Sequence, residues 1–218
     1  MPSDDDRFAG FGTGAPAFFA GLEADNSKAY FAARRDVYER AIREPLERLL
    51  EEARGEYGTY VKVFRANRDV RFSADKRPYR TDALGGVADE RTRVVSYVCL
   101  DREGLVAGAG WLHPDSEQLA RARAVIASDA AAAHELQVVL DDLEAGGFTC
   151  EGNPLRTAPK GYARDHPAVG LLRRRRFTAE RRFTSPGDFS DPARARTAVF
   201  GTWQAASQLS GWLASRAT

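Results

Sequence analysis

The chain has 218 residues, of which 43% are hydrophobic and 29% are charged, a composition typical of folded globular proteins and unlike that of disordered ones. Lys and Arg (32) nearly balance Asp and Glu (31), and the formal net charge of +1 excludes an overall field that would attract the molecule to nucleic acid or to an anionic membrane. Any electrostatic recognition must therefore be local.

The N-terminal residues do not have the pattern of a signal peptide. The N-terminal residues MPSDDDRFAG are acidic where a signal peptide is basic and then apolar, and no stretch approaches the ~18 to 20 apolar residues of a membrane span. We expect a cytoplasmic protein with no membrane partner. No linker, repeat or low-complexity tract interrupts the chain, so we expect one domain over residues 1–218, with residues 1–10 flexible.

Helical patterns come first along the chain. Residues 15–24 repeat apolar side chains at helical spacing and predict a helix. Asn26 or Ser27 is a suitable N-cap for a second helix. Pro45 is expected to restart that helix in its first turn, because proline lacks the N–H group that a helix interior needs.

Strand patterns follow. Residues 59–64 alternate and contain β-branched and aromatic side chains, which predicts a strand. Residues 93–101 and 105–111 are two further strand segments, and the short connection between them contains Gly104. This arrangement predicts a hairpin and, with the first strand, an antiparallel sheet.

The second half of the sequence is again mainly helical. Asp115 is expected to cap a helix of about a dozen residues, and residues 128–146 predict another. Residues 148–167 are rich in Gly and Pro and predict a loop, residues 171–183 a short helix and then an edge strand, and residues 190–214 a closing helix. The predicted fold class is therefore α+β, an antiparallel sheet with helices packed around it.

One stretch without helical or strand period stands out. Residues 64–80, FRANRDVRFSADKRPYR, hold six cations and two aspartates and follow directly after a predicted strand. Rigid elements often position such segments for function, and guanidinium and ammonium groups suit phosphate and carboxylate. We predict that this stretch binds a small anionic ligand. The predicted binding residues are Arg65, Arg68, Arg71, Lys76, Tyr79 and Arg80.

The remaining candidates have supporting roles in this hypothesis. Asp69 and Asp75 could orient the cations or act as a general base, and whether any reaction is catalysed stays open. Lys160 and Arg175, in two distant segments, are secondary candidates for completing the site. Phe72, like Tyr79, could stack on a base or sugar.

Two other interpretations of the charged stretch remain. Its aspartates could pair with its own cations, so that the stretch is a structural clasp in a non-enzymatic interaction domain. Alternatively, the stretch and the arginines of residues 173–182 could form a nucleic-acid groove, a partner that the near-zero net charge makes less favourable. The oligomeric state stays open.

The sequence contains no recognisable cofactor or metal motif. The glycines of residues 107–110 are too few for a dinucleotide fingerprint, and no P-loop or catalytic triad is recognisable. The three histidines show no metal-ligand spacing, and Cys99 and Cys150 form no CxxC pair and are interpreted as ordinary thiols. We expect no cofactor and no metal.

The charged stretch also resembles a family motif. Residues 65–80 are similar to the pattern R-x-x-R-D-x-R-F-s-x-D-K-x-P-Y-K of a bacterial and fungal domain-of-unknown-function family, DUF2461, with Arg80 in place of the last Lys. The segments ADNSKAYF, GAGWLHP, APKGYARDHP and LLRRRRF resemble further family segments, so the likeness covers most of the chain. It implies an α+β fold and supplies no activity and no catalytic residues.

Overall fold

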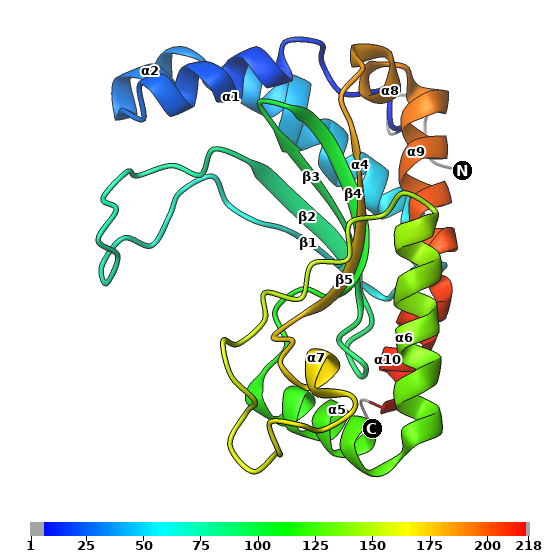
Figure 1. Cartoon of the computed structure of the whole chain (residues 1–218). Coiled ribbons are helices and arrows are strands. Elements are labelled where there is room, and N and C mark those ends of the chain that lie inside the picture. Colours follow the sequence, from blue (N-terminus) through cyan, green and yellow to red (C-terminus); the bar gives the residue numbers. More distant parts are fainter. Residues whose placement is uncertain (1–6, 217–218) are drawn as a thin grey trace. The chain divides into compact units, whose positions relative to one another are not determined.

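The computed structural model describes residues 7–216 (Figure 1). Within these residues, five strands form one antiparallel sheet in the order β1-β2-β3-β4-β5, so neighbours in sequence are neighbours in the sheet. Helices precede, separate and follow the strands, and the predicted α+β class is confirmed. The strands are β1 (Tyr60–Val63), β2 (Ala83–Ala88), β3 (Val95–Asp101), β4 (Gly104–Trp111) and β5 (Phe177–Phe183).

The described chain divides into two compact units. Unit 1 comprises residues 7–87, 97–107 and 182–201, and unit 2 comprises residues 88–96, 108–181 and 202–216. Strands β3, β4 and β5 each contribute residues to both units. That residues 1–218 fold as a single domain stays a prediction.

The expected flexible end falls partly outside the described residues, which begin at residue 7. In the described part, Phe8 is 2% exposed, and its main-chain N–H donates to the carboxylate of Glu52 at 2.8 Å. Arg196 donates to the carbonyl oxygen of Phe8 at 2.8 Å and also pairs with Glu52. Phe8 is therefore held in place within unit 1.

Unit 1 begins with the predicted helices. The first helix matches the predicted range, and the side chain of Ser27 accepts the N–H of Tyr30 as the N-cap of the second. Pro45 lies in the first turn of the last of these helices, as expected. The elements are α1 (Ala15–Ala24), α2 (Lys28–Ala33), α3 (Arg35–Tyr38), a π-helical turn (Glu39–Arg43) and α4 (Glu44–Ala53).

Strand β2 was not predicted from the sequence. Its residues Gly85 and Gly86 weaken the local strand signal, because glycine has no side chain to pack on a sheet. In the fold, a Cβ atom at Gly85 would lie 2.6 Å from Cδ1 of Leu50 in α4. A side chain at Gly85 would therefore displace the Leu50 side chain, a contact between α4 and the sheet that only the tertiary structure reveals.

Unit 2 is built mainly from helices. Its helices include α5 (Ser116–Ser128), α6 (Ala130–Ala145), α7 (Val169–Leu172) and α10 (Ser207–Arg216). Asp115 caps α5 through a reciprocal capping box with Gln118, as its position predicted. The Trp111 side chain is 1% exposed, and its Nε1–H donates to the carbonyl oxygen of Thr92 at 3.0 Å. This bond satisfies the one polar group of a buried ring.

The prediction of one continuous closing helix over residues 190–214 was wrong. The structure has two helices over this range, α9 (Pro192–Ala205) and α10, with a turn at Ala206 between them, and the short helix α8 (Pro186–Ser190) precedes them. Pro192 begins α9, where its missing N–H costs no helical hydrogen bond. The apolar periodicity that suggested one helix runs through the turn at Ala206 and does not indicate it.

In the part of the chain that the structure describes, no helix has both the length and the hydrophobicity that a membrane span requires. The expected cytoplasmic location stays a prediction.

We expect Gly104→Ala to lower the free energy of unfolding by more than the ~1–3 kcal/mol of backbone strain alone. Gly104 turns the β3–β4 hairpin at a φ of +126°, and a Cβ atom there would lie 2.4 Å from the carbonyl oxygen of Phe183. Gly55→Ala is the matched control, because Gly55 has a φ of +94° with open space around it. Urea unfolding gives the free energy of unfolding of both variants. Gly55→Ala reports backbone strain alone, and Gly104→Ala reports strain together with the clash. An equal loss of stability in the two variants would contradict the prediction.

Candidate functional site

The charged stretch lies in the connection between β1 and β2, residues 64–82, here called the β1–β2 loop. It projects from the strands of unit 1 as a long excursion (Figure 1). Its base is closed by an isolated antiparallel bridge between Asn67 and Tyr79, and the N–H of Arg68 donates to the carbonyl oxygen of Pro78 at 2.8 Å. The two arms of the loop therefore begin with strand-like pairing.

Asn26 fastens this base to the N-terminal helices. Its Oδ1 accepts the N–H of Tyr79 at 2.9 Å, and its Nδ2 donates to the carbonyl oxygen of Tyr79 at 3.2 Å. The Tyr79 ring stacks on Phe31 with ring centroids 4.2 Å apart and planes 3° apart, and Tyr79 is 8% exposed. The ring of Tyr79 therefore anchors the loop and is covered by Phe31 on one face.

The outer part of the loop is held by local bonds. Arg71 forms a two-nitrogen ion pair with Asp69, with Nη2 2.6 Å from Oδ2, and both side chains are exposed. This pairing lowers the pKa of Asp69 from its ordinary value. Lys76 donates through Nζ to the carbonyl oxygen of Val70 at 3.0 Å. Phe72 is 97% exposed, and Cζ of Arg71 lies 6.0 Å from the centre of its ring.

Asp75 lies between two arginines. Its carboxylate accepts bonds from Nε and Nη2 of Arg77 and from Nη1 of Arg68, the shortest at 2.7 Å. Arg77, through side-chain and main-chain bonds, and then Arg68 lower the pKa of Asp75 far below its ordinary value. A carboxylate held so strongly in its charged form is a poor general base and a good orienter of guanidinium groups.

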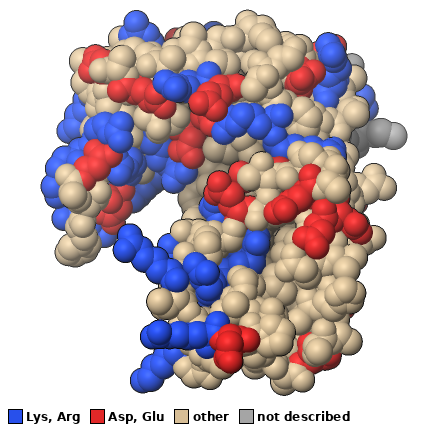
Figure 2. Space-filling view, viewed as in Figure 1, with Lys and Arg blue, Asp and Glu red and all other residues tan. Residues whose placement is uncertain are grey.

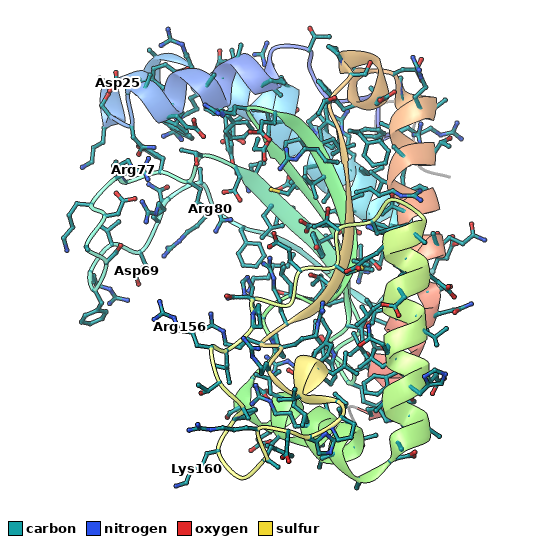
Figure 3. The ribbon with its side chains drawn as sticks, in the orientation of Figure 1. Asp25, Asp69, Arg77, Arg80, Arg156 and Lys160 are labelled. Carbon is teal, nitrogen blue, oxygen red and sulfur yellow. The ribbon has the colours of Figure 1, made fainter. Side chains whose placement is uncertain are left out.

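A cavity of about 260 Å³, here called the arginine cavity, lies beside these residues. Figure 3 shows Arg77 on the β1–β2 loop and Arg80 nearer its base. Three arginines and two aspartates of the described chain line the cavity, together with a tyrosine and a threonine: Arg68, Asp75, Arg77, Tyr79, Arg80, Thr81 and Asp82. Figure 2 shows cationic and acidic side chains interleaved over the same loop.

The wall next to β2 is formed by a second ion pair. Arg80 donates through Nη2 to Oδ2 of Asp82 at 2.7 Å, and the two side chains are each about 30% exposed. The Cys99 thiol donates to the same oxygen at 3.5 Å, and burial, followed by the charge of Asp82, raises the pKa of Cys99. Nε of Arg80 is buried without a partner among the described residues, beside the ring of Phe64.

The structure brings together only part of the predicted set. Arg68, Tyr79, Arg80 and Asp75 line the arginine cavity, whereas Arg65, Arg71, Lys76 and Asp69 are not among its lining residues. Arg77, Thr81 and Asp82 line it and were not proposed from the sequence. The sequence signal for these three residues was weak. Arg77 lies inside the charged stretch, and Thr81 and Asp82 directly follow it.

The arginine run of unit 2 has another role. Its four members all bind the segment of residues 150–155: Arg173 donates to the Leu155 carbonyl, Arg174 to that of Cys150, Arg175 to the carbonyl and side chain of Asn153, and Arg176 to the Glu151 carboxylate. The run is thus a clasp for a loop that has few main-chain bonds of its own. Lys160 is exposed on its loop, as Figure 3 shows.

Two further hollows are less suited to a charged ligand. One of about 230 Å³ in unit 2 contains Arg181, which already stacks on Phe148 and donates to the carbonyl oxygen of Gly146. Another, of about 390 Å³ in unit 1, contains Arg194 paired with Asp188. In residues 7–216, no three His, Cys, Asp or Glu side chains gather in a way that would hold a metal ion.

These observations define an α+β protein with an arginine-lined cavity beside its sheet. The model of a family described as conserved hypothetical protein (DUF2461) matches residues 15–212, and the chain belongs to this family. Neither a curated protein nor a solved structure matches the chain. The family description names no activity, so the chemistry of the cavity is the guide to function.

Asn26→Ala is expected to lower the free energy of unfolding by about 1–3 kcal/mol, because both main-chain groups of Tyr79 lose their partner. Faster hydrogen exchange at the Tyr79 amide should accompany the loss. Asn67→Ala is the control on the same loop, since the Asn67 side chain is exposed and has no hydrogen bond within residues 7–216. An Asn26→Ala protein as stable as the control would show that Asn26 does not anchor the loop.

Arg174→Ala is expected to destabilise the protein by about 1–3 kcal/mol, because the Cys150 carbonyl loses a donor and the packing against Gly152 is lost. Burial lowers the pKa of Arg174, in keeping with a structural position. Arg164→Ala is the control, because Arg164 is exposed and makes no hydrogen bond in the described chain. Thermal unfolding of both variants is the measurement, and a similar melting temperature for the two would refute the clasp in unit 2.

Proposed function

We propose that the arginine cavity binds a small ligand through a phosphate or carboxylate group. The observation that carries this proposal is the number of unused guanidinium nitrogens around one cavity. Nε and Nη2 of Arg68, Nη1 of Arg77 and Nη1 of Arg80 make no hydrogen bond to the residues that the structure describes. Nε of Arg80 is also unpaired among these residues, but it is buried and is not counted as a ligand donor.

The arrangement of the arginines supports an anion in particular. A guanidinium group is a planar fork that matches the oxygens of phosphate and carboxylate, and each arginine here is already oriented by an aspartate. Orientation by a fixed partner reduces the side-chain entropy that binding would otherwise remove. Three guanidinium groups against two carboxylates leave one positive charge for a ligand to neutralise.

The second candidate function is the structural clasp of a non-enzymatic interaction domain. It is favoured by Asp75, whose oxygens are engaged by Arg68 and Arg77, and by the Arg71 to Asp69 pair. Under this alternative the loop's cations serve the loop itself, and the cavity holds only water.

Nucleic acid is a less favoured partner. Tyr79, one of the two proposed stacking residues, lies under Phe31, and the arginines of residues 173–176 are bound to a loop of their own unit. Phe72, the other stacking residue, is exposed. The arginine cavity therefore has more support from the contacts than a nucleic-acid groove has.

We expect wild-type protein to bind inorganic phosphate saturably and Arg80→Gln to weaken that binding about tenfold, since a lost charge-assisted bond corresponds to roughly 1.4 kcal/mol or more. Arg71→Gln is the matched control: the change is the same and Arg71 lies outside the cavity. Titration calorimetry at low and high salt measures both. Absent phosphate binding, or an equal loss in the two variants, would leave the clasp as the better account.

A further inference from the structure

The two carboxylates of the arginine cavity are used differently. Asp75 has both oxygens engaged: Oδ1 accepts from the main-chain N–H and Nε of Arg77, and Oδ2 accepts from Arg77 and Arg68. Asp82 has one oxygen engaged, because Arg80 and the Cys99 thiol both donate to Oδ2. Within residues 7–216, nothing donates a hydrogen bond to Oδ1 of Asp82.

An unengaged carboxylate oxygen is unfavourable in a site that recognises only an anion. Like charges repel at short range, so Asp82 lowers the affinity of the cavity for any ligand that offers oxygens alone. The repulsion changes to attraction if the ligand also carries a hydrogen-bond donor that reaches Oδ1. Asp75 does not require a donor from the ligand, because both of its oxygens already accept hydrogen bonds from Arg68 and Arg77.

Charge decides which kind of donor fits. An ammonium group beside a carboxylate would make a zwitterion of zero net charge, which leaves the single positive charge of the cavity uncompensated. A hydroxyl group donates to Asp82 and leaves the ligand negative. The volume of about 260 Å³ is slightly below the usual range of ligand pockets, which suits a compound of few heavy atoms.

We propose that the ligand is a small hydroxyl-bearing anion, such as a polyol phosphate or a hydroxy acid, whose hydroxyl donates to Oδ1 of Asp82 while its anionic group binds Arg68, Arg77 and Arg80. This inference rests on the proposed function and specifies the class of compound for the same cavity. Asp82 is then the residue that distinguishes hydroxylated anions from plain ones.

Matched ligand pairs test the proposal. Glycerol phosphate is compared with propyl phosphate, and glycerate with propanoate, so that each pair differs only in hydroxyl groups and the two pairs distinguish phosphate from carboxylate. For the pair that binds, wild-type protein should favour the hydroxylated member by about tenfold or more in Kd, the effect of one hydrogen bond to a charged group. Titration calorimetry gives the four constants.

Two variants assign the effect to Asp82. Asp82→Asn retains an acceptor for Arg80 and replaces the free carboxylate oxygen by an amide donor. A ligand hydroxyl can still accept from that donor, but the bond is no longer charge-assisted, so most of the affinity ratio within the pair should be lost. Asp69→Asn is the control, because Asp69 pairs with Arg71 outside the cavity, and its ratio should equal that of the wild type. Because the ratio is taken within one protein, a general change in anion affinity from the lost charge cancels.

The outcomes are distinguishable. If wild-type protein binds both members of a pair equally, or if Asp82→Asn retains the preference, the ligand class inferred here is wrong while anion binding stands. If inorganic phosphate and all four compounds fail to bind, the proposed function fails, and this inference fails with it. The comparison of ligands on wild-type protein requires no substitution. It therefore tests the preference for hydroxylated ligands even if Asp82→Asn does not fold.

Discussion

Two hydrogen bonds between the Asn26 side chain and the main chain of Tyr79 are the constraint on which the candidate site depends. They act as a short piece of strand pairing, and the stacking of Tyr79 on Phe31 adds apolar contact at the same point. The residues directly after Tyr79 are thereby fixed where the chain enters β2. These contacts hold Tyr79 in place, so Arg80 and Asp82 can form one wall of the cavity.

The arginines of this protein illustrate how the same side chain serves different ends. In unit 2, the run of residues 173–176 is engaged largely by main-chain carbonyl oxygens, which a loop without regular structure leaves in need of donors. In the β1–β2 loop the partners are carboxylates, each of which orients a guanidinium group without using all of its nitrogens. Composition alone does not distinguish the two cases, because both appear as clusters of positive charge.

Local signals in the sequence predicted much of the fold. The apolar repeat of residues 15–24, the hairpin around Gly104 and the capping of α5 by Asp115 all depend on residues close together in the chain. Strand β2 was not predicted because the glycine at position 85 reflects its close packing against Leu50, which lies 35 positions away in the sequence, and not its sequence neighbours. The site was predicted in part for the same reason: charge density marks the loop, whereas the choice of lining side chains follows from its pairing geometry.

The sequence by itself determined the α+β class, most helix and strand positions, and the loop that carries the surplus of positive charge. Only the tertiary structure decided which cations face a common cavity, that Arg77 and Asp82 belong to it and Arg71 does not, and that the second arginine cluster is a clasp. The physical reason is the range of the interactions. Periodicity, caps and turns act over a few residues, whereas the direction of a guanidinium group is set by whichever acceptor the folded chain brings within hydrogen-bond distance.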